Sequence, residues 1–458
     1  MASSTITRTS LSGWGRHPVV ESRVARPEKQ SALRKLIDGG EGSLLPHGAG
    51  RSYGDAALSA DGVVADLNRL DRMLDFDPET GLLRAEAGVR LREILNVFVP
   101  RGWFPPVTPG TKDVTLGGAI AFDVHGKNHH CDGGFSNFVE RFDLLTASGE
   151  TLSCSRDRND NLFWATVSGA GLTGIITEVT LRLRPIETAQ VSTRHIKARD
   201  LDEAFAIFEE HEPDHTYAVA WIDCLASGSS LGRSICMFGD HATQEDLAAR
   251  GRSNGAPLAY ETSRLFDLPV DLPSGLLNRY TVQAFNRLYY ARQRSRDVQG
   301  IEAIDPFFYP LDVLGDWNRM YGSEGFVQYQ CVLPMEESYE GLTKLLTRLS
   351  EAGEASFLAV LKRMGEEDGG MLSFPMRGYT LALDIPYREG LEDFLYELDR
   401  IVVDHGGRVY LAKDAALQPE TFRAMYPGAE DFLEVKREVD PEGRFSSELG
   451  KRVGLCSG

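Results

Sequence analysis

The sequence predicts an α+β protein built from two domains. Its 458 residues are roughly three times the ~150 residues of an average domain, which allows two or three hydrophobic cores. Up to about residue 185, short apolar runs alternate with glycine-rich turns, a pattern typical of short strands. From about residue 190, longer helical patterns separate strands rich in aromatic residues. This change of texture places a domain boundary near residue 190.

The first region is expected to contain strands and short helices in alternation. The apolar runs predict strands at Leu44–Leu45, Gly62–Leu67, Leu82–Ala87, Phe142–Ala147 and Ile175–Leu183. Helical patterns lie between them at Leu91–Val99, Leu116–Phe122 and Leu162–Val167, and Pro185 closes the region.

The second region is expected to form an antiparallel sheet with helices on one face. Helices are predicted at Leu201–Glu210, Val282–Arg292 and Leu342–Ala352, and strands at Tyr217–Ile222, Phe326–Leu333 and Tyr379–Ile385. A helix over 390–404 has a continuous apolar stripe, and Gly406 suits its end. A strand over 408–412 and helices near 418–426 and 430–438 complete the chain.

Composition and charge exclude several classes of protein. The 67 acidic residues exceed the 49 Lys and Arg, giving a net charge of −18, and no basic run with interleaved aromatics offsets it. Such a surface repels phosphodiester backbones, so nucleic acid is not an expected partner. No 18 apolar residues run together, and the N-terminal MASSTITRTSLSGWGRH lacks the apolar core of a signal peptide. We expect a cytoplasmic protein, and peripheral contact with the inner membrane stays open.

The loop from Pro46 to Asp55 is a candidate anion site. Three glycines let successive backbone N–H groups converge, and Arg51 and Ser52 add side-chain donors. The loop does not match the dinucleotide-binding fingerprint, because Tyr53 stands where the third glycine is needed and a strand follows. A plain tight turn is the alternative.

Two further glycine-rich segments suggest close approach of the backbone to a ligand or to a neighbouring element. Gly169–Gly174 matches GxGxxG, but a helix precedes it and a strand follows, which is the reverse of a Rossmann site. Gly117 and Gly118 occupy the start of a predicted helix, where glycine costs stability. Tight packing of helix against sheet explains that pair equally well.

A polar cluster runs from His125 to His130. His125 and His129 have the i,i+4 spacing of zinc ligands, but Gly126 stands where a metalloprotease has Glu, so we expect no metal. Hydrogen bonding to a polar ligand, with Lys127 as a cation, is the favoured interpretation, and a solvated loop is the alternative.

Polar side chains also interrupt apolar strands in the second region. Gln328 and Gln330 share one strand face by alternation, so one pocket wall could present both amides. Lys362 and Lys413 follow apolar runs, and a buried lysine needs a partner or a function. Exposure at a sheet edge is the alternative for all four side chains.

Taken in order, these segments resemble the vanillyl-alcohol-oxidase-type FAD-binding (PCMH-type) oxidoreductase family. GAGRSYGD, PGT…TLGGAIA and SGAGLTGIIT look like its flavin-binding elements. HGKNHH, FVQYQ, LSFP, YLAKD and Asp440-Pro441…Phe445 are similar to a branch of the family that oxidises polyprenylphosphoryl ribose. The resemblance implies an FAD-binding domain over 1–190, completed by 410–458, and a substrate-binding domain over 191–409.

The resemblance also implies the residues that hold FAD. On the pyrophosphate side and around the flavin these are Arg51, Ser52, Tyr53, Gly54, Asp55, Gly110, Thr111, Val114, Thr115, Gly117, Gly118, Ala119, Phe122, His125, Gly126, Asn128, His129, Ile176, Tyr410, Ala412 and Lys413. Many relatives have a flavin-linked His where this chain has Tyr53, so noncovalent FAD is expected.

The implied reaction is oxidation of the ribose C2 hydroxyl to a ketone by hydride transfer to flavin N5, the first half of an epimerisation to the arabinose donor used in cell-wall arabinan biosynthesis. Candidates for the group that takes the hydroxyl proton are Lys413, His125 and water held by Tyr53, in that order. The substrate pocket would contain Lys127, Trp221, Arg319, Gln328, Gln330 and Lys362.

An NAD(P)H-dependent short-chain reductase would be the functional partner. The alternative is a soluble aldonolactone or sugar-alcohol oxidase on the same fold. A third hypothesis, a binding module without catalysis, is disfavoured by the intact glycine turns. The resemblance also shows a departure, because Ala382 stands where the mycobacterial-type sequence has Cys, so thiol-reactive inhibitors of that position should fail.

Overall fold

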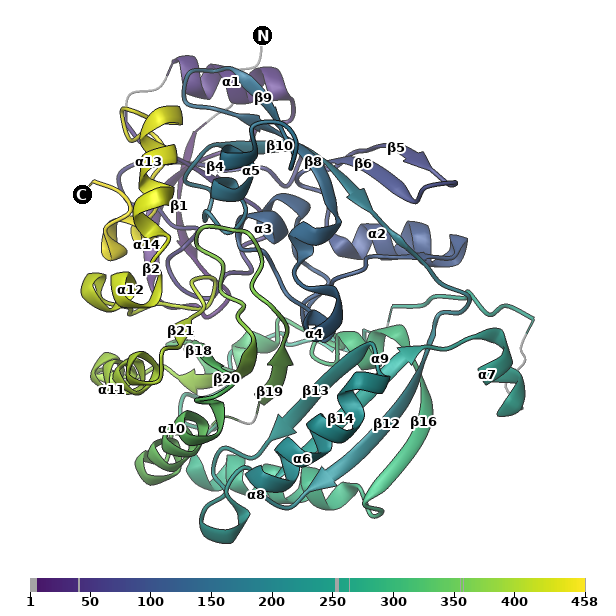
Figure 1. Ribbon diagram of the computed structural model, residues 1–458. Coiled ribbons are helices and arrows are strands. Elements are labelled where there is room, and N and C mark those ends of the chain that lie inside the picture. Colours follow the sequence, from purple (N-terminus) through teal and green to yellow (C-terminus); the bar gives the residue numbers. More distant parts are fainter. Residues whose placement is uncertain are drawn as a thin grey trace.

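A computed structural model describes residues 6–39, 42–251, 255–262, 264–354, 356 and 358–457. The first five residues of the N-terminal segment, Met1–Thr5, lie outside this set. Figure 1 shows two layered regions stacked along the long direction of the molecule, with both chain termini on the upper region.

The upper region contains two sheets. The first has the order β1-β2-β4-β3 and the second β5-β6-β10-β8-β9. Their strands are β1 (Thr7–Ser12), β2 (Val19–Ala25), β3 (Leu44–His47), β4 (Val63–Asp66), β5 (Met73–Asp77), β6 (Leu82–Glu86), β8 (Val139–Leu145), β9 (Thr151–Cys154) and β10 (Ile175–Arg182). The helices are α1 (Gln30–Asp38), α2 (Leu91–Phe98), α3 (Leu116–Ala121), α4 (His129–Asp132) and α5 (Asp160–Thr166), and a two-stranded ribbon pairs β7 (Trp103–Phe104) with β11 (Arg184–Pro185).

The lower region is a single sheet of eight strands in the order β16-β12-β14-β13-β19-β20-β18-β21. Every neighbouring pair in it is antiparallel, as predicted. The strands are β12 (Gln190–Ala198), β13 (Tyr217–Ile222), β14 (Ser234–His241), β16 (Asp297–Ala303), β18 (Phe326–Pro334), β19 (Ala359–Met364), β20 (Gly378–Pro386) and β21 (Arg408–Val409).

Helices cover this sheet. Helix α6 (Leu201–His211) contacts β12 and β14, while α10 (Ser338–Ala352) and α11 (Leu391–Asp404) contact β18 (Figure 1). The predicted stripe of α11 is buried at Leu391, Phe394, Leu395, Leu398 and Val402. The remaining elements are α7 (Gln244–Ala249), α8 (Arg279–Arg292), α9 (Ile304–Phe308) and a short parallel pair, β15 (Phe266–Asp267) with β17 (Leu314–Gly315).

The C-terminal segment returns to the upper region. Helices α12 (Pro419–Met425), α13 (Ala429–Val439) and α14 (Glu448–Val453) follow one another there, and α13 packs on α5 (Figure 1). The Leu44 N–H donates to the Arg444 carbonyl at 2.7 Å, which brings the chain end beside β3. The prediction of domains over 1–190 with 410–458 and over 191–409 agrees with this course of the chain but stays a prediction.

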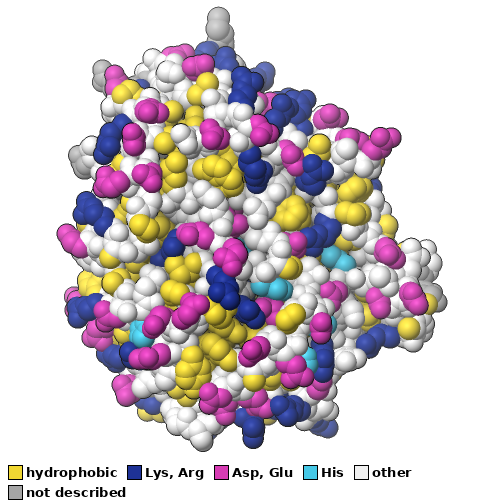
Figure 2. Space-filling model, viewed as in Figure 1, with side chains coloured by type: hydrophobic (Ala, Val, Ile, Leu, Met, Phe, Trp, Pro, Cys, Tyr) yellow, Lys and Arg dark blue, Asp and Glu magenta, His cyan; other side chains and the backbone are white. Residues whose placement is uncertain are grey.

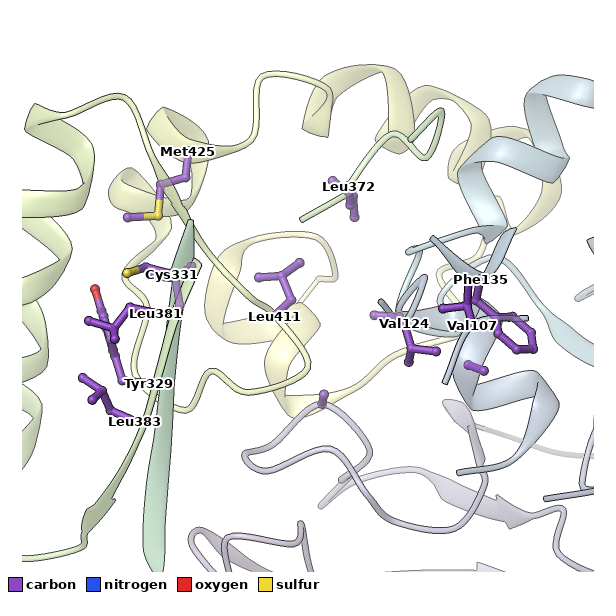
Figure 3. Packing of buried hydrophobic residues seen from close by; sticks show 14 of the residues in the cluster. Val107, Val124, Phe135, Tyr329, Cys331, Leu372, Leu381, Leu383, Leu411 and Met425 are labelled. Atoms are coloured by element: carbon purple, nitrogen blue, oxygen red, sulfur yellow. The ribbon is translucent and has the colours of Figure 1, made fainter. Parts of the chain in front are cut away.

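One hydrophobic core joins the two regions. In Figure 3, Val107, Val124 and Phe135 of the upper region form one group, and Tyr329, Cys331, Leu381 and Leu383 of the large sheet form another. Leu372 and Leu411 lie between the groups, and all of these residues belong to the same cluster. This continuity holds the upper loops against the edge of the sheet.

The predicted strand at the start of the C-terminal segment is wrong in its extent. The strand expected over 408–412 ends at Val409. Its ladder to β18 stops there, and the Ala412 carbonyl instead accepts a hydrogen bond from the Tyr53 N–H at 2.9 Å. The Tyr410 N–H still donates to the Gln330 carbonyl of β18 at 2.8 Å, and after it the chain leaves the sheet and reaches the loop of the upper region.

No helix in the described ranges is both long enough and apolar enough to cross a bilayer.

Candidate active site

A cavity of about 450 Å³ lies where the upper loops meet the large sheet. Three of its sides come from the β3–β4 loop, the segment leading into α3, and the start of β10. The opposite side comes from β18, β19, β20 and residues 410–413. Of the predicted site residues, it is lined by Arg51, Ser52, Tyr53, Gly110, Thr111, Val114, Thr115, Gly117, Gly118, Phe122, His125, Ile176, Gln328, Gln330, Lys362, Tyr410, Ala412 and Lys413.

The loop side of the cavity is built by close backbone packing. A Cβ added at Gly48 would collide with Oγ1 of Thr115, so the loop lies directly on the start of α3. Thr115 caps that helix, its Oγ1 accepting from the Gly118 N–H at 3.2 Å. Gly50 has a φ of 62°, a conformation that favours glycine. The glycines thus bring backbone amides to the cavity surface, as the anion-nest interpretation requires.

Several buried polar atoms on this cavity have no partner among the described residues. They include Nε of Arg51, Oγ of Ser52 and Nδ1 of His125. The Arg51 guanidinium lies 4.0 Å from the centroid of the Trp14 ring and 3.5 Å from a carboxylate oxygen of Asp113. Because unpaired buried donors are costly, these three atoms indicate a ligand that supplies acceptors along the cavity.

The sheet side of the cavity carries buried cations. Nζ of Lys413 lies 3.8 Å from the centroid of the Tyr53 ring. Burial lowers the pKa of Lys413 to about 7, with the nearby Asp384 opposing the shift and Lys362 adding to it. Burial alone lowers the pKa of Lys362 to about 8. Both ammonium groups therefore titrate near neutral pH, where a side chain can exchange protons with a substrate.

His125 is held in one orientation by Gln330. The Gln330 Nε2 donates to Nε2 of His125 at 2.9 Å and to Oγ1 of Thr380 at 3.2 Å. Since Nε2 of the imidazole accepts, the hydrogen-bond network assigns the proton to Nδ1. Burial, followed by Lys362, lowers the pKa of His125 well below its ordinary value, so the ring is neutral. Its unpaired Nδ1–H is a directed donor for a ligand atom.

Sequence reasoning missed Asp384 as part of this site. The residue is fully buried on β20 opposite Gln328 of β18, and its Oδ1 accepts a hydrogen bond from the Gln328 Nε2. Burial raises the pKa of Asp384 to about 7. An acidic residue inside the apolar run Tyr379–Ile385 was the signal that could have revealed it.

Six residues predicted to contact FAD do not line the cavity. Asp55 is paired with Arg452 at 2.8 Å, and a Cβ at Gly54 would collide with the Asp414 carbonyl. His129 donates from Nε2 to Asp368 at 2.9 Å, and Asn128 donates to the Pro106 carbonyl at 2.9 Å. The six residues outside the cavity lining are Gly54, Asp55, Ala119, Gly126, Asn128 and His129. Direct contact with the cofactor stays a prediction that this placement does not favour.

Three residues predicted for the substrate pocket also lie outside the cavity lining. Lys127 donates to the Phe307 carbonyl, and burial lowers its pKa to about 7. Trp221 packs on Tyr289 with ring centroids 4.8 Å apart. Arg319 is paired with Asp271 at 2.8 Å. Each of the three side chains is engaged with the protein.

The zinc-like spacing of His125 and His129 does not bring the rings together on one ion. Their centroids are 6.4 Å apart at an interplanar angle of 82°, and each ring bonds to a different protein group. Within the described ranges no cluster of three or more His, Cys, Asp or Glu residues could hold a metal ion.

A cavity with a backbone anion nest on one side and titratable donors on the other defines a class of protein that binds a phosphorylated redox cofactor. Comparison with known proteins agrees. Residues 22–155 match the FAD binding domain family, and residues 326–453 match the D-arabinono-1,4-lactone oxidase family. The chain is an FAD-dependent oxidoreductase, and the predicted FAD-binding fold is confirmed.

The relatives narrow this class. Decaprenylphosphoryl-beta-D-ribose oxidase of Mycolicibacterium smegmatis is 39% identical over 98% of both chains. L-gulono-1,4-lactone dehydrogenase of Mycobacterium tuberculosis is 24% identical over 96% of this chain and 98% of its own. L-gulonolactone oxidase of Scyliorhinus torazame is 25% identical over 87% of this chain and 86% of its own. The chain belongs to the family of decaprenylphosphoryl-beta-D-ribose oxidase.

The residues present fit FAD. The nest of backbone amides, the unpaired Nε of Arg51 and the unpaired Oγ of Ser52 suit a pyrophosphate, which offers several anionic acceptors. The unpaired Nδ1–H of His125 suits a ring nitrogen or carbonyl on the same ligand.

Proposed function

We propose that this protein oxidises the C2 hydroxyl of a polyprenylphosphoryl-β-D-ribose to the 2-keto sugar, the first half of an epimerisation to the arabinose donor. The observation that carries the proposal is the buried Lys413, whose pKa of about 7 suits a general base, on the wall opposite the anion nest. The 39% identity over 98% of both chains with decaprenylphosphoryl-beta-D-ribose oxidase supports this substrate class.

Lys413 is the group that takes the hydroxyl proton in this proposal. Its neutral amine accepts the proton at Nζ, and the resulting ammonium lies beside the fully buried Asp384. FAD, when bound, supplies the acceptor for the hydride at its N5. A cation formed at Nζ then stabilises negative charge that develops next to it in a dry site. His125 and water held by Tyr53 remain second and third candidates for the base.

The sheet wall would orient the sugar. Gln328 and Gln330 present amides from one strand, and Asp384, His125 and Thr380 lock their orientation. Lys362 forms no ion pair with any described residue and lies half-buried in the cavity lining, where desolvation lowers its pKa. A buried cation without a carboxylate partner suits a hydroxyl-rich or phosphate-bearing substrate, which would supply the missing acceptor.

We further propose that the FAD is bound noncovalently. Tyr53 replaces the His that links flavin in many relatives, and its ring is buried against Lys413 and Phe326. Denaturing the holoprotein in acid should release all of the yellow flavin into the supernatant. Flavin that stays with the precipitated protein would contradict noncovalent binding.

The keto product requires a second enzyme. An NAD(P)H-dependent short-chain reductase that delivers hydride to the opposite face of the ketone would complete the inversion at C2. A lipid-borne substrate also implies peripheral contact with the inner membrane from the cytoplasmic side.

A soluble aldonolactone or sugar-alcohol oxidase is the second candidate. Residues 326–453 match the D-arabinono-1,4-lactone oxidase family, and several relatives with 23–29% identity are named for lactones. The substrate wall of the cavity lies largely within that matched range.

The deciding experiment is anaerobic bleaching of the flavin absorbance. A short-prenyl phosphoryl ribose and L-gulono-1,4-lactone are offered separately to the purified holoprotein. Bleaching by the phosphoryl ribose alone is the expected result. Bleaching by the lactone alone would replace the proposal with the second candidate, and a protein that binds no flavin would overturn both.

A further inference from the structure

Helix α8 faces the solvent with its apolar side. Tyr280 is 79% exposed and Leu288 72% exposed, and Ala284 and Ala291 lie on the same stripe at helical spacing. The polar Asn286 is instead fully buried and donates to Asp223 at 2.8 Å. A surface helix normally has the reverse arrangement, so this outward stripe lacks a partner among the described residues.

The apolar surface continues along the segment that precedes α8. Leu265, Phe266, Val270 and Leu276 are 75%, 53%, 60% and 45% exposed. Phe266 belongs to β15, which pairs with β17. Both residues of β17, Leu314 and Gly315, line the cavity together with Arg264. The exposed apolar surface therefore extends to the rim of the active-site cavity.

The charge of this segment is opposite to that of the whole chain. Residues 278–296 contain five arginines and no acidic residue, although the protein has a net charge of −18. Arg296 pairs with Glu203, whereas Arg279, Arg287, Arg292 and Arg294 form no ion pair with a described residue.

The acidic residues beside the segment are neutralised. Asp271 pairs with Arg16 and Arg319 at 3.0 and 2.8 Å, and Asp297 pairs with Arg194 at 2.6 Å. Elsewhere the signs are mixed, since Asp and Glu are spread among Lys and Arg over the whole face shown in Figure 2. A local excess of unpaired positive charge thus borders the exposed apolar stripe.

We propose that α8 and residues 264–277, together called the docking surface, bind the surface of an anionic lipid membrane. An amphipathic helix with exposed apolar side chains between arginines lies in the plane of the headgroups, with its apolar face buried in the acyl boundary. Isologous pairing with a second copy would bring the three unpaired arginines of α8, Arg279, Arg287 and Arg292, close to those of the other copy, which is unfavourable. An anionic lipid membrane offers acyl chains to the exposed apolar side chains and negatively charged headgroups to the arginines.

This inference rests on the proposed function for its purpose, because a membrane-borne substrate could then pass from the bilayer along the apolar rim to the cavity. The physical argument for the docking surface depends only on exposure and charge. The docking surface and the proposed function can therefore be refuted separately.

The test is co-sedimentation of the holoprotein with vesicles, without substrate. Wild type should sediment with vesicles of phosphatidylglycerol and phosphatidylcholine in equal parts, bind phosphatidylcholine alone weakly, and dissociate as salt increases. The double variants Tyr280→Ser with Leu288→Ser, and Arg287→Glu with Arg292→Glu, should each weaken vesicle binding about tenfold or more.

Matched controls lie on β1, on β2 and at Ile6 just before β1, and both strands are far from α8 in Figure 1. Ile6→Ser with Val19→Ser removes two exposed apolar side chains, and Arg8→Glu with Arg23→Glu reverses two exposed charges. Both controls should bind vesicles like wild type. Equal losses in controls and α8 variants, or no loss in any, would overturn the docking surface.

Two further measurements separate the alternatives. Light scattering in solution would reveal a dimer lost in the α8 variants, which would assign the surface to a second copy and overturn the proposal. Anaerobic bleaching by the short-prenyl substrate should be unchanged in the α8 variants, since their side chains do not line the cavity. Normal vesicle binding without any bleaching would leave the docking surface intact and refute the proposed substrate.

Discussion

The two walls of the active-site cavity use different physical means. The loop wall relies on backbone amides held by close packing, as at Gly48 against Thr115. The sheet wall relies on buried side chains that titrate, with Lys413 at about pH 7 and Lys362 at about pH 8. A wall of amides binds the same anion at every pH near neutrality, whereas the sheet wall changes charge there. The first suits a cofactor that stays bound, and the second suits a proton transfer that must reverse in each turnover.

The largest expected effect on flavin reduction comes from removing the Lys413 amine from the sheet wall. Lys413→Met should slow anaerobic flavin reduction by the phosphoryl ribose about 10²–10⁴-fold, because general base catalysis contributes that much. Bound flavin should stay at the wild-type level, since the loop wall is untouched. Stopped-flow reduction together with the flavin-to-protein absorbance ratio measures both, and unchanged turnover would remove Lys413 from the mechanism.

A change in the loop wall should have the opposite effect to Lys413→Met: it should weaken FAD binding and leave flavin reduction intact. Gly48→Val would push the loop away from Thr115 and weaken FAD binding about 10–100-fold, which is ~1.4–3 kcal/mol. Any holoprotein recovered at high FAD should still be reduced by substrate. The control is Gly255→Ala, a glycine with open space around its Cβ, and it should retain flavin in a titration of the apoprotein. Equal flavin loss in both variants would contradict the packing argument.

The pH profile tests the coupling within the sheet wall. If neutral Lys413 is the base, flavin reduction rises as pH increases through about 7. Asp384→Asn removes a negative charge that raises the pKa of Lys413, so the midpoint should move to lower pH by roughly one unit. Lys362→Met removes a positive charge that lowers that pKa, so the midpoint should move to higher pH. Shifts in the same direction would refute the coupling.

The smallest expected effect is at Ala382, which lines the sheet wall on β20. Ala382→Cys adds one sulfur and should change the rate of flavin reduction by about twofold at most, in line with a mild small-to-large change. The variant should gain labelling by a thiol reagent that wild type lacks at this position, as mass spectrometry of the β20 peptide would detect. A large loss of activity would mean that this wall tolerates no added volume.

Much of the fold could be predicted because local patterns coincide with tertiary demands. The predicted strand Tyr217–Ile222 has the bounds of β13, and it is buried along its whole length. Helix α8 begins at Arg279, three residues before the predicted start, because Asn278 caps it with bonds to the N–H groups of Tyr280 and Thr281. Residues 410–412 read as strand from their apolar character. The Tyr410 N–H does donate to the Gln330 carbonyl of β18 at 2.8 Å, but the Ala412 carbonyl accepts from the Tyr53 N–H of the upper loop at 2.9 Å.

The sequence by itself determined the chemistry that the protein can perform. The glycine loop, the His cluster and the interrupted strands are local patterns, and their resemblance to a known family implied a flavin-binding α+β oxidoreductase. The predicted ligand contacts of Asp55, His129 and Arg319 could not be checked locally, because each side chain is hydrogen-bonded to a partner more than 45 positions away.

Only the tertiary structure decided which polar residues reach the cavity and how they titrate. Lys413 and Lys362 depart from ordinary lysines because burial removes water. Lys362 adds to the shift in the pKa of Lys413, whereas Asp384 of β20 opposes it. Desolvation and pairing depend on long-range contacts, which no local pattern encodes. The sequence therefore named the reacting groups, and the packing of two distant regions set their charge.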